Sequence, residues 1–208
     1  MLDRTTIREL LAPFITTLPD STVDRVLIYL ELLLRWNRKI NLTAIERPEE
    51  CITRHFGESF LASRVTPLNG RLLDVGSGAG FPGLAIKLIA PELDVVLLEP
   101  VAKKRAFLKE AARACDTTQV EVAGGRIEEF ARAQESPSFD IITMRAVGGL
   151  EALINSAAIL LKPGGCLCLW VGRQQLRAIR NASPGIRFRD PLAIPLSHDR
   201  YILTGTSI

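Results

Sequence analysis

From residue 71 onwards, short apolar runs alternate with stretches of helical periodicity, and this alternation restricts the fold more than any other feature of the sequence. Strands are expected at residues 71–75, 94–99, 120–123, 140–143 and 166–171, with helices between them. This order indicates an α/β fold, in which a mostly parallel sheet is flanked by helices on both faces. Right-handed crossovers place the C-terminal ends of such strands on one edge, where folds of this class bind ligands.

The first third of the chain is expected to be helical instead. Apolar residues recur at helical spacing over residues 23–39, and a second helix is expected over residues 48–64. Pro67 and Asn69–Gly70 then interrupt the pattern. We therefore expect residues 1–69 to form a helical cap, packed on a core domain of residues 70–208 to give one structural unit.

The most informative stretch is residues 72–83, LLDVGSGAGFPG, where a strand must turn sharply into a helix. Gly76, Gly78 and Gly80 permit unusual backbone angles and a close approach of a ligand to the main chain. A dinucleotide fingerprint needs a third glycine where Phe81 stands. Asp74 would also repel a pyrophosphate, whereas its carboxylate favours a sulfonium or an α-amino group. The loop therefore predicts S-adenosylmethionine as the cofactor and a Rossmann-like class I methyltransferase fold.

Two further segments at the same sheet edge are candidate cofactor contacts. Glu99 ends the second expected strand, at the spacing from the loop where an acidic side chain takes both ribose hydroxyls. Ile127 and Glu128 follow the third strand, where backbone groups can meet the adenine. A helix-start carboxylate without ligand contact is an equally good interpretation of Glu128.

Charge and cysteine usage limit the class of protein further. The formal net charge is +3, and residues 170–208 hold six arginines against Asp190 and Asp199. Such a surplus suits phosphate binding, although a solvated surface explains it equally well. The four cysteines show no C-x-x-C spacing, so we expect buried reduced thiols and no metal. No segment is long and charge-free enough to span a membrane, and the charged N-terminus is unlike a secretory signal, so the cytoplasm is the expected compartment.

With these residues in place, the sequence resembles the RsmG (GidB) family of bacterial rRNA guanine-N7 methyltransferases. The resemblance covers nearly the whole chain and includes the proline after the glycine loop. The residues that carry it are Trp36-Asn37, Asn41-Leu42-Thr43, Arg54-His55 with Ser59, residues 74–83, Lys103-Lys104-Arg105 with Phe107-Leu108, residues 126–129, Phe139-Asp140 and Arg145-Ala146.

The resemblance implies a substrate and a set of contacts. The substrate would be a guanine in a loop of 16S rRNA near the decoding site, within naked RNA or an assembling small subunit. Glu99 stands at the ribose-binding position of the family. The implied cofactor contacts are Gly76, Phe81, Ile127, Glu128 and Arg145.

The chain also departs from the family. Glu58 stands where the family usually has Asp, and Met144 where it usually has Ser. Val171-Gly172 replaces a usual Lys-Gly pair after the fifth strand, and residues 203–208 lack the Lys or Arg often found there. Loss of a cation near the substrate face would weaken RNA binding or change the target.

No general base is evident, and N7 methylation needs none, because N7 already bears a lone pair. Arg145 could contact the cofactor, a phosphate or the guanine O6 edge, or form a structural salt bridge. For His55 a structural role is favoured over a catalytic one. Phe81 and Trp36 are candidates for stacking on a base, although burial is favoured for Trp36.

Other functions remain open from the sequence. A nicotinamide-dependent oxidoreductase shares the fold class, but Phe81 and Asp74 argue against it. A non-catalytic RNA-binding or ribosome-assembly module, or a methyltransferase with a changed RNA target, is the main alternative, and Val171 favours it. We expect a monomer, since no large apolar stripe remains once the core is assigned.

Overall fold

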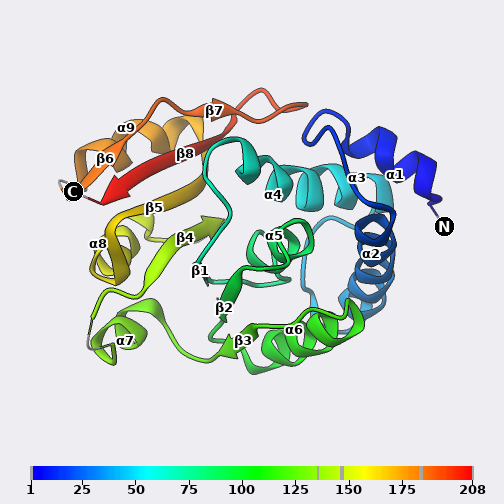
Figure 1. Cartoon of the computed structure of the whole chain (residues 1–208), viewed down its shortest axis with the longest axis horizontal. Helices are drawn as coiled ribbons and strands as arrows, with labels where there is room; N and C mark the ends of the chain where they lie inside the picture. Colours follow the sequence, from blue (N-terminus) through cyan, green and yellow to red (C-terminus); the bar gives the residue numbers. More distant parts are fainter. Residues whose placement is uncertain (1, 135, 146–147, 183–184, 208) are drawn as a thin grey trace.

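The computed structural model describes residues 2–134, 136–145, 148–182 and 185–207, and these form an α/β fold around one central sheet (Figure 1). The strand order is β3-β2-β1-β4-β5-β8-β6, with β7 paired to β8. The first five strands are parallel, and β8 runs antiparallel to β5, β6 and β7. The strands are β1 (Arg71–Val75), β2 (Asp94–Leu98), β3 (Val120–Ala123), β4 (Phe139–Arg145), β5 (Leu161–Gly172), β6 (Ile186–Phe188), β7 (Leu192–Ala193) and β8 (Arg200–Ser207).

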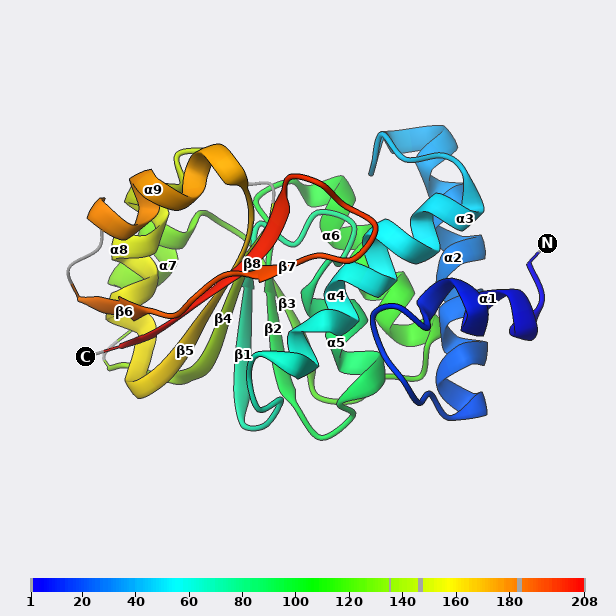
Figure 2. The same ribbon diagram turned by 90° about the horizontal axis from the view of Figure 1, so that it is seen from above.

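Helices cover both faces of the sheet (Figure 2). One face carries α4 (Glu58–Phe60), α5 (Gly83–Ile89) and α6 (Ala102–Ala114), with α1 (Arg4–Leu11), α2 (Asp20–Ile40) and α3 (Pro48–Cys51) beyond them. The other face carries α7 (Ile127–Arg132), α8 (Leu150–Leu160) and α9 (Arg173–Ala182). The predicted fold class, a mostly parallel sheet between helices, is confirmed.

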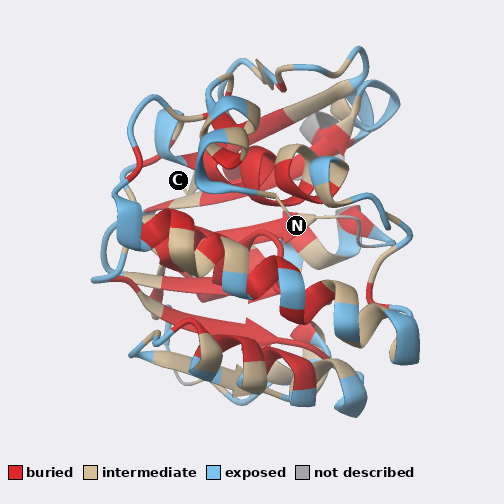
Figure 3. Cartoon of the chain, turned by 90° about the vertical axis from the view of Figure 1, so that its right-hand side faces the viewer, coloured by how far each residue is buried: buried red, intermediate tan, exposed pale blue. Residues whose placement is uncertain are grey.

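Two hydrophobic clusters lie on the two faces, because successive side chains of each strand point in opposite directions. Leu72 and Ile141 belong to the first cluster, with α1, α2, α5 and α6, and Leu73 and Ile142 to the second, with α7, α8 and α9. The first cluster runs without a break from the N-terminal helices into the sheet, and Figure 3 shows the buried layer. The division into a cap of residues 1–69 and a core of residues 70–208 stays a prediction.

The elements that the sequence did not reveal lie mainly at the two ends of the chain. Helix α1, helix α9 and strands β6, β7 and β8 were not expected. The helix expected over residues 48–64 is instead a continuous helical run of α3, a π-helical turn (Ile52–Gly57), α4 and a 3₁₀ turn (Leu61–Arg64). The π turn rotates the side chains that follow it relative to a regular helix, and such turns occur frequently at functional sites.

The four cysteines are free thiols. Cys166 and Cys168 both face the first cluster, as expected for residues two apart in a strand. Among the described residues, no three His, Cys, Asp or Glu side chains gather closely enough to hold a metal ion. Nor does any helix in the described ranges have the length and apolar character needed to cross a membrane.

Candidate functional site

The glycine loop between β1 and α5 has the conformation that its sequence requires. Gly76, Gly78 and Gly80 have φ angles of 69°, 55° and 83°, in the left-handed region that side chains with a Cβ disfavour. The Gly76 amide donates to the carbonyl of Leu98 at the end of β2 (2.8 Å). The loop is thereby fixed against the neighbouring strand, and the three glycines are explained by backbone geometry.

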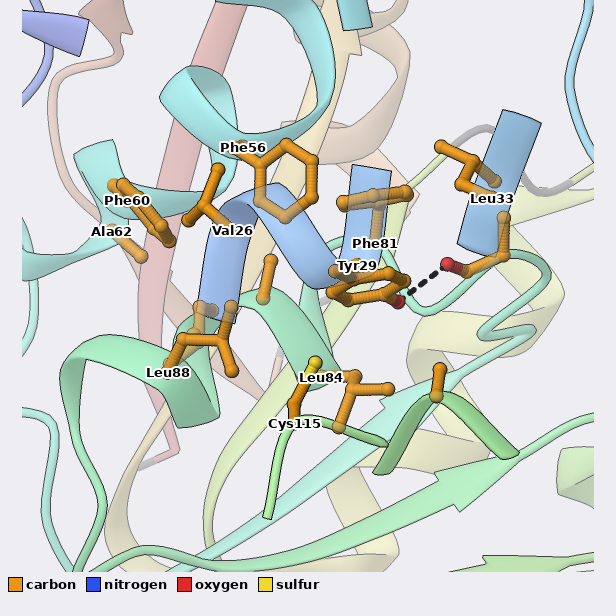
Figure 4. Packing of buried hydrophobic residues seen from close by; sticks show 14 of the residues in the cluster. Val26, Tyr29, Leu33, Phe56, Phe60, Ala62, Phe81, Leu84, Leu88 and Cys115 are labelled. Carbon is orange, nitrogen blue, oxygen red and sulfur yellow. Dashed lines mark hydrogen bonds between the residues drawn. The ribbon is translucent and has the colours of Figure 1, made fainter. Parts of the chain in front are cut away.

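Tyr29 of helix α2 supports this loop from below, a role that the sequence did not reveal (Figure 4). Its hydroxyl is fully buried and donates to the carbonyl of Ala79 (2.7 Å). A Cβ atom at Gly80 would collide with the same hydroxyl oxygen. In the sequence, Tyr29 is one of the residues at helical spacing that are expected in the core. Only its hydroxyl group indicates a polar contact.

Asp74 lies at the end of β1, fully buried behind the loop. Its Oδ1 accepts a hydrogen bond from the Thr143 hydroxyl (2.7 Å), whereas Oδ2 has no partner among the described residues. Burial raises the pKa of Asp74 to about 6, although the hydroxyls of Thr143 and Ser77 act in the opposite direction. Gly83 leaves room for this carboxylate, since a Cβ there would overlap the Asp74 side chain.

Glu99 and the glycine loop meet, although the sequence separates them by about twenty residues. The Glu99 side chain is 3% exposed; its Oε2 accepts from the Gly78 amide (2.8 Å) and its Oε1 from the Val101 amide (2.9 Å). Each carboxylate oxygen has a second lone pair, so both retain the capacity to accept from a ligand hydroxyl.

A first cavity of about 480 Å³ opens beside the loop, on the face of the sheet that carries α7 and α8. Ile127 is buried there, and Glu128 is half-buried in the first turn of α7. The structure therefore brings Gly76, Ile127 and Glu128 together at one sheet edge. The lining residues are Val75, Gly76, Leu98, Pro100, Gly125–Glu128, Gly148, Gly149, Ala152 and Leu153.

A second cavity of about 390 Å³ lies across the loop and shares Gly76 with the first. The segment after α2, the π-helical turn, the glycine loop and Arg145 at the end of β4 contribute to its walls. Its cationic lining comes from Arg54, Lys104 and Arg145. The remaining lining residues are Leu42–Ile45, His55, Gly76–Ala79 and Phe81.

Phe81 forms part of a stack of protein rings. Its ring is parallel to those of Tyr29 (centroids 5.3 Å apart, 13°) and His55 (4.5 Å, 12°), and the residue is 7% exposed. The rings of Tyr29 and His55 therefore already stack on the ring of Phe81, the predicted candidate for stacking on a base. Trp36 is half-buried, packs edge-on against Phe107 and donates to Glu110 Oε2 (3.1 Å).

His55 is buried at the top of this stack and is a neutral ring. Its Nε2 lies 2.9 Å from the Thr43 hydroxyl, and Nδ1 has no partner in the described part of the chain. Burial, together with the nearby guanidinium groups of Arg145 and Arg54, lowers its pKa to about 3. A ring this hard to protonate suits the structural role predicted for His55.

Arg145 takes part in an ion-pair network; a structural salt bridge was one of the roles open to it from the sequence, but the partners were not identified. Its Nη2 pairs with Glu58 Oε2 (3.2 Å) and donates to the carbonyl of Arg54 (2.7 Å). Glu58, only 1% exposed, also binds Arg200 of β8 through Oε1 (2.7 Å). Glu58 had been noted only as a mild departure from the family pattern. Ala146, the other member of the predicted Arg145-Ala146 pair, lies outside the described residues.

Val171 lies within β5 and is 3% exposed in the second hydrophobic cluster. Its neighbour Trp170 points to the opposite face, where its indole N–H donates to the backbone carbonyl of Glu58 (2.9 Å). The departure at Val171 therefore concerns a core position beneath α8 and α9.

The sequence matches the family described as GidB, rRNA small subunit methyltransferase G, over residues 23–197. The chain belongs to the GidB family. A relative from Syntrophotalea carbinolica named ribosomal RNA small subunit methyltransferase G is 35% identical over 200 residues, covering 96% of this chain and 92% of the relative. A protein of the same name from Stenotrophomonas maltophilia is 36% identical, covering 87% and 85%.

Solved structures agree with the fold of this GidB protein. TrmN from Thermus thermophilus superposes with a TM-score of 0.60 at 19% identity, over 76% of this chain and 53% of that one. A SAM-dependent methyltransferase from Aquifex aeolicus gives 0.57 at 16% identity, over 73% and 90%. At these identities the likeness concerns the fold alone. Family membership identifies the GidB chain as an S-adenosylmethionine-dependent methyltransferase and rules out the oxidoreductase alternative.

Proposed function

We propose that this protein transfers a methyl group from S-adenosylmethionine to N7 of a guanine in 16S rRNA, near the decoding region of the small ribosomal subunit. One observation carries the proposal: the two cavities meet at Gly76, one lined by backbone and apolar groups and the other by cations. The first suits an adenosine, and the second suits a nucleotide of an RNA chain. Ribosomal RNA is also the substrate in the names of the curated relatives.

The residues present fit the cofactor. Glu99 is held beside Gly78 with lone pairs to spare for ribose hydroxyls, and the glycine loop leaves its backbone open to close approach. Asp74 is proposed to support the loop from behind, since its carboxylate is buried. The full set of proposed cofactor contacts is Asp74, Gly76, Gly78, Gly80, Phe81, Glu99, Ile127, Glu128 and Arg145.

When bound, S-adenosylmethionine supplies a methyl group already activated on a sulfonium. The N7 lone pair needs no base, so the task of this chain is to orient the guanine and to keep water away from it. His55 stays neutral on one side of the second cavity, because its lowered pKa prevents protonation near neutral pH. Arg54, Lys104 and Arg145 hold positive charge at the cavity, which favours entry of the RNA backbone.

Methyl transfer from labelled S-adenosylmethionine to small subunits and to their naked RNA, followed by mapping of the product, tests the proposal. A single N7-methylguanine in the decoding-region loop is the expected product. Cofactor binding with no transfer to either substrate would contradict it. The same assay shows which form of the RNA is used.

A changed RNA target is the second candidate, and the observation that favours it is Val171 in place of the family's usual lysine. Val171→Lys introduces the cation usual in the family, and the matched change Leu169→Lys places one two residues earlier on the same strand face. If the target is changed, methylation maps to another nucleotide and Val171→Lys raises transfer to the decoding-region guanine. If the target is the usual one, neither variant gains activity.

We further propose that the protein acts as a monomer in the cytoplasm. Its large exposed apolar side chains in the described part of the chain are scattered over separate elements: Ile28, Val101, Ile159 and Leu196. No continuous apolar patch follows from these positions. Sedimentation should give one monomer mass at all concentrations, and a stable dimer would contradict this.

A further inference from the structure

The surplus of arginine near the C-terminus is largely unexplained by the two cavities. Residues 170–208 hold six arginines, and from the sequence alone phosphate binding and a solvated surface explain them equally well. Arg200 is engaged in its ion pair with Glu58. Three of the six belong to α9, whose ten residues include no aspartate or glutamate. Helix α9 is therefore the element in which the surplus is concentrated.

Two arginines of α9 stand where cations are unfavourable for the helix itself. Arg173 is the first residue of α9, and a positive charge opposes the helix dipole at this end. Arg177 follows four residues later, so the two like charges lie on the same face and repel one another. Both side chains are exposed. Helix stability does not explain this pair, whereas attraction of an anion does.

The two arginines are also available to a ligand. The Arg177 side chain forms no hydrogen bond or ion pair with any described residue. Arg173 Nε lies 3.5 Å from Asp199 Oδ1, and these two side chains are 66% and 79% exposed. An ion pair this exposed contributes little stability, so a phosphate can replace the carboxylate at small cost.

The start of α9 is fixed beside the site. Trp170 of β5 lies opposite Arg145 of β4 in the sheet, so α9 begins three residues beyond the level of Arg145, at the edge where both cavities lie. The Gly172 amide donates to Gln175 Oε1 (3.0 Å), and the Arg173 amide donates to the Asp199 carbonyl (2.9 Å). These bonds hold the first turn of α9 in place before any ligand arrives.

A hollow connects this turn with the first cavity. Helices α8 and α9 lie side by side (Figure 2), and a third cavity of about 370 Å³ lies between them. It shares Gly149 and Ala152 with the first cavity, and none of its described lining residues is acidic. The hollowed surface thus continues from the proposed cofactor cavity to α9. The lining residues are Gly149, Leu150, Ala152, Gln175, Ala178 and Ile179.

We propose that α9 binds the backbone of the RNA strand next to the target guanine, with Arg173 and Arg177 each contacting a phosphate. This inference rests on the proposed function, because the strand belongs to the RNA that is methylated. A guanidinium donates paired N–H groups that match the oxygens of a phosphate. Contacts of this kind position the strand without reading its sequence. The strand would run across the ends of β4 and β5, from the second cavity to α9.

The test measures how RNA binding depends on salt. Kd and KM are determined over a series of salt concentrations, for small subunits or their naked RNA, whichever the wild type methylates. The variants are Arg173→Gln, Arg177→Gln, the double variant and Arg177→Lys. Arg187→Gln is the matched control, because Arg187 is an exposed arginine of the same surplus. Its neighbours Ile186 and Phe188 belong to the second cluster, so Arg187 points to the opposite face of the sheet.

Each glutamine variant should weaken RNA binding on the order of 5-fold at about 0.1 M salt and reduce the slope of log Kd against log salt by about 0.7. The double variant should lose about 25-fold, with a slope reduced by about 1.4. Arg177→Lys should keep the slope, and Arg187→Gln should change neither quantity. The kcat at saturating RNA and the Kd of S-adenosylhomocysteine should stay at their wild-type values in all variants, because α9 holds neither the reacting base nor the cofactor.

Cross-linking identifies the molecule that α9 contacts. Gln174 is exposed between the two arginines, so an aryl azide on the thiol of Gln174→Cys should cross-link to RNA within a few nucleotides of the modified guanine. The same probe on Arg187→Cys is the control, and wild type treated with the probe gives the background of the native thiols. Cross-links from Gln174→Cys to a ribosomal protein alone would assign α9 to a protein partner and overturn the inference.

An unchanged salt slope in the double variant would also overturn it, as would an equal loss of binding in Arg187→Gln, which would indicate a general effect of charge. Loss of folding stability in Arg177→Gln would contradict the view that this arginine is kept for a ligand. Absence of methyl transfer by the wild type would instead contradict the proposed function. The failure of the inference and the failure of the proposed function are therefore distinguishable.

Discussion

The two cavities on either side of the glycine loop differ in how their polar groups are satisfied. Next to the first, Glu99 lies between the lining residues Leu98 and Pro100 and has both oxygens bonded to backbone amides, and the loop itself is bonded to β2. At the second, Arg54 Nε, His55 Nδ1 and Arg145 Nη1 are buried with no partner in the described ranges. Paired groups stabilise the fold, whereas unpaired ones cost stability and are kept for a ligand. Substitutions at the two cavities should therefore change stability in opposite directions.

The largest effect is expected at the loop that both cavities share. Gly80→Ala combines a positive φ with a collision against Tyr29, and should cost about 3–5 kcal/mol in unfolding free energy and abolish cofactor binding. Gly164→Ala is the matched control, because Gly164 also has a positive φ (78°) but open space around it. It should cost about 1–2 kcal/mol. Denaturant unfolding checks both, and equal losses would mean that Tyr29 is not a rigid support.

Asp74→Asn should stabilise the protein above neutral pH. Because the folded pKa of Asp74 is about 6, above the usual 3.8, the native state binds the extra proton, and wild-type stability falls as pH rises between these values. The amide avoids this loss, which amounts to about 3 kcal/mol above pH 7, while its oxygen still accepts from Thr143. Unfolding at pH 4 and pH 8 measures the difference. A variant less stable than the wild type at pH 8 would show that the charge is compensated.

Glu99→Ala should have the opposite sign, because Glu99, between the lining residues Leu98 and Pro100 of the first cavity, is a paired group. It leaves the amides of Gly78 and Val101 without an acceptor, and should lower stability as well as weaken cofactor affinity by about 10- to 100-fold. Glu128→Ala, at the half-buried position in the same cavity, serves as the comparison and should have a smaller effect. Calorimetry with S-adenosylhomocysteine measures both, and unchanged affinity in Glu99→Ala would remove it from the ribose site.

The smallest effect is expected for His55→Phe, and it depends on pH. The wild-type native state resists protonation of His55 down to about pH 3, so wild-type stability is lost as pH falls below the ordinary histidine pKa of 6.5. Phenylalanine keeps the stack on Phe81 without this loss, so the variant should be more stable than the wild type by about 2 kcal/mol at pH 5 and nearly equal at pH 8. His198→Gln, at an exposed histidine, is the control. A variant that loses stability equally at both pH values would contradict the prediction.

The sequence predicted the parts of the fold whose signals are local. The parallel strands β1 to β5 and the glycine loop follow from short apolar runs and from backbone needs that only glycine meets. Strands β6 to β8 were not expected, because their stability comes from pairing with one another and with β5 rather than from a pattern in each segment.

The same limit applies to the candidate site. Asp74, Glu99 and Arg145 were found at strand ends, where the topology places them together. Glu58 and Tyr29 were missed because each acts through a contact with a distant segment, and periodicity alone marks them as ordinary helix residues. The predicted individual contacts with the cofactor remain predictions.

The position of strand β8 near residue 200 has a consequence for how the protein folds during its synthesis. Arg200 and Glu58 are 142 residues apart in the chain, yet Arg200 donates to Oε1 of Glu58, whose Oε2 pairs with Arg145 of the second cavity. Synthesis proceeds from the N-terminus, and domains fold as their segments emerge. The helices and parallel strands can therefore assemble early. The ion pair between Glu58 and Arg200 can form only after β8 has left the exit tunnel. The ion-pair network around Glu58 is therefore completed later in synthesis than the helices and parallel strands.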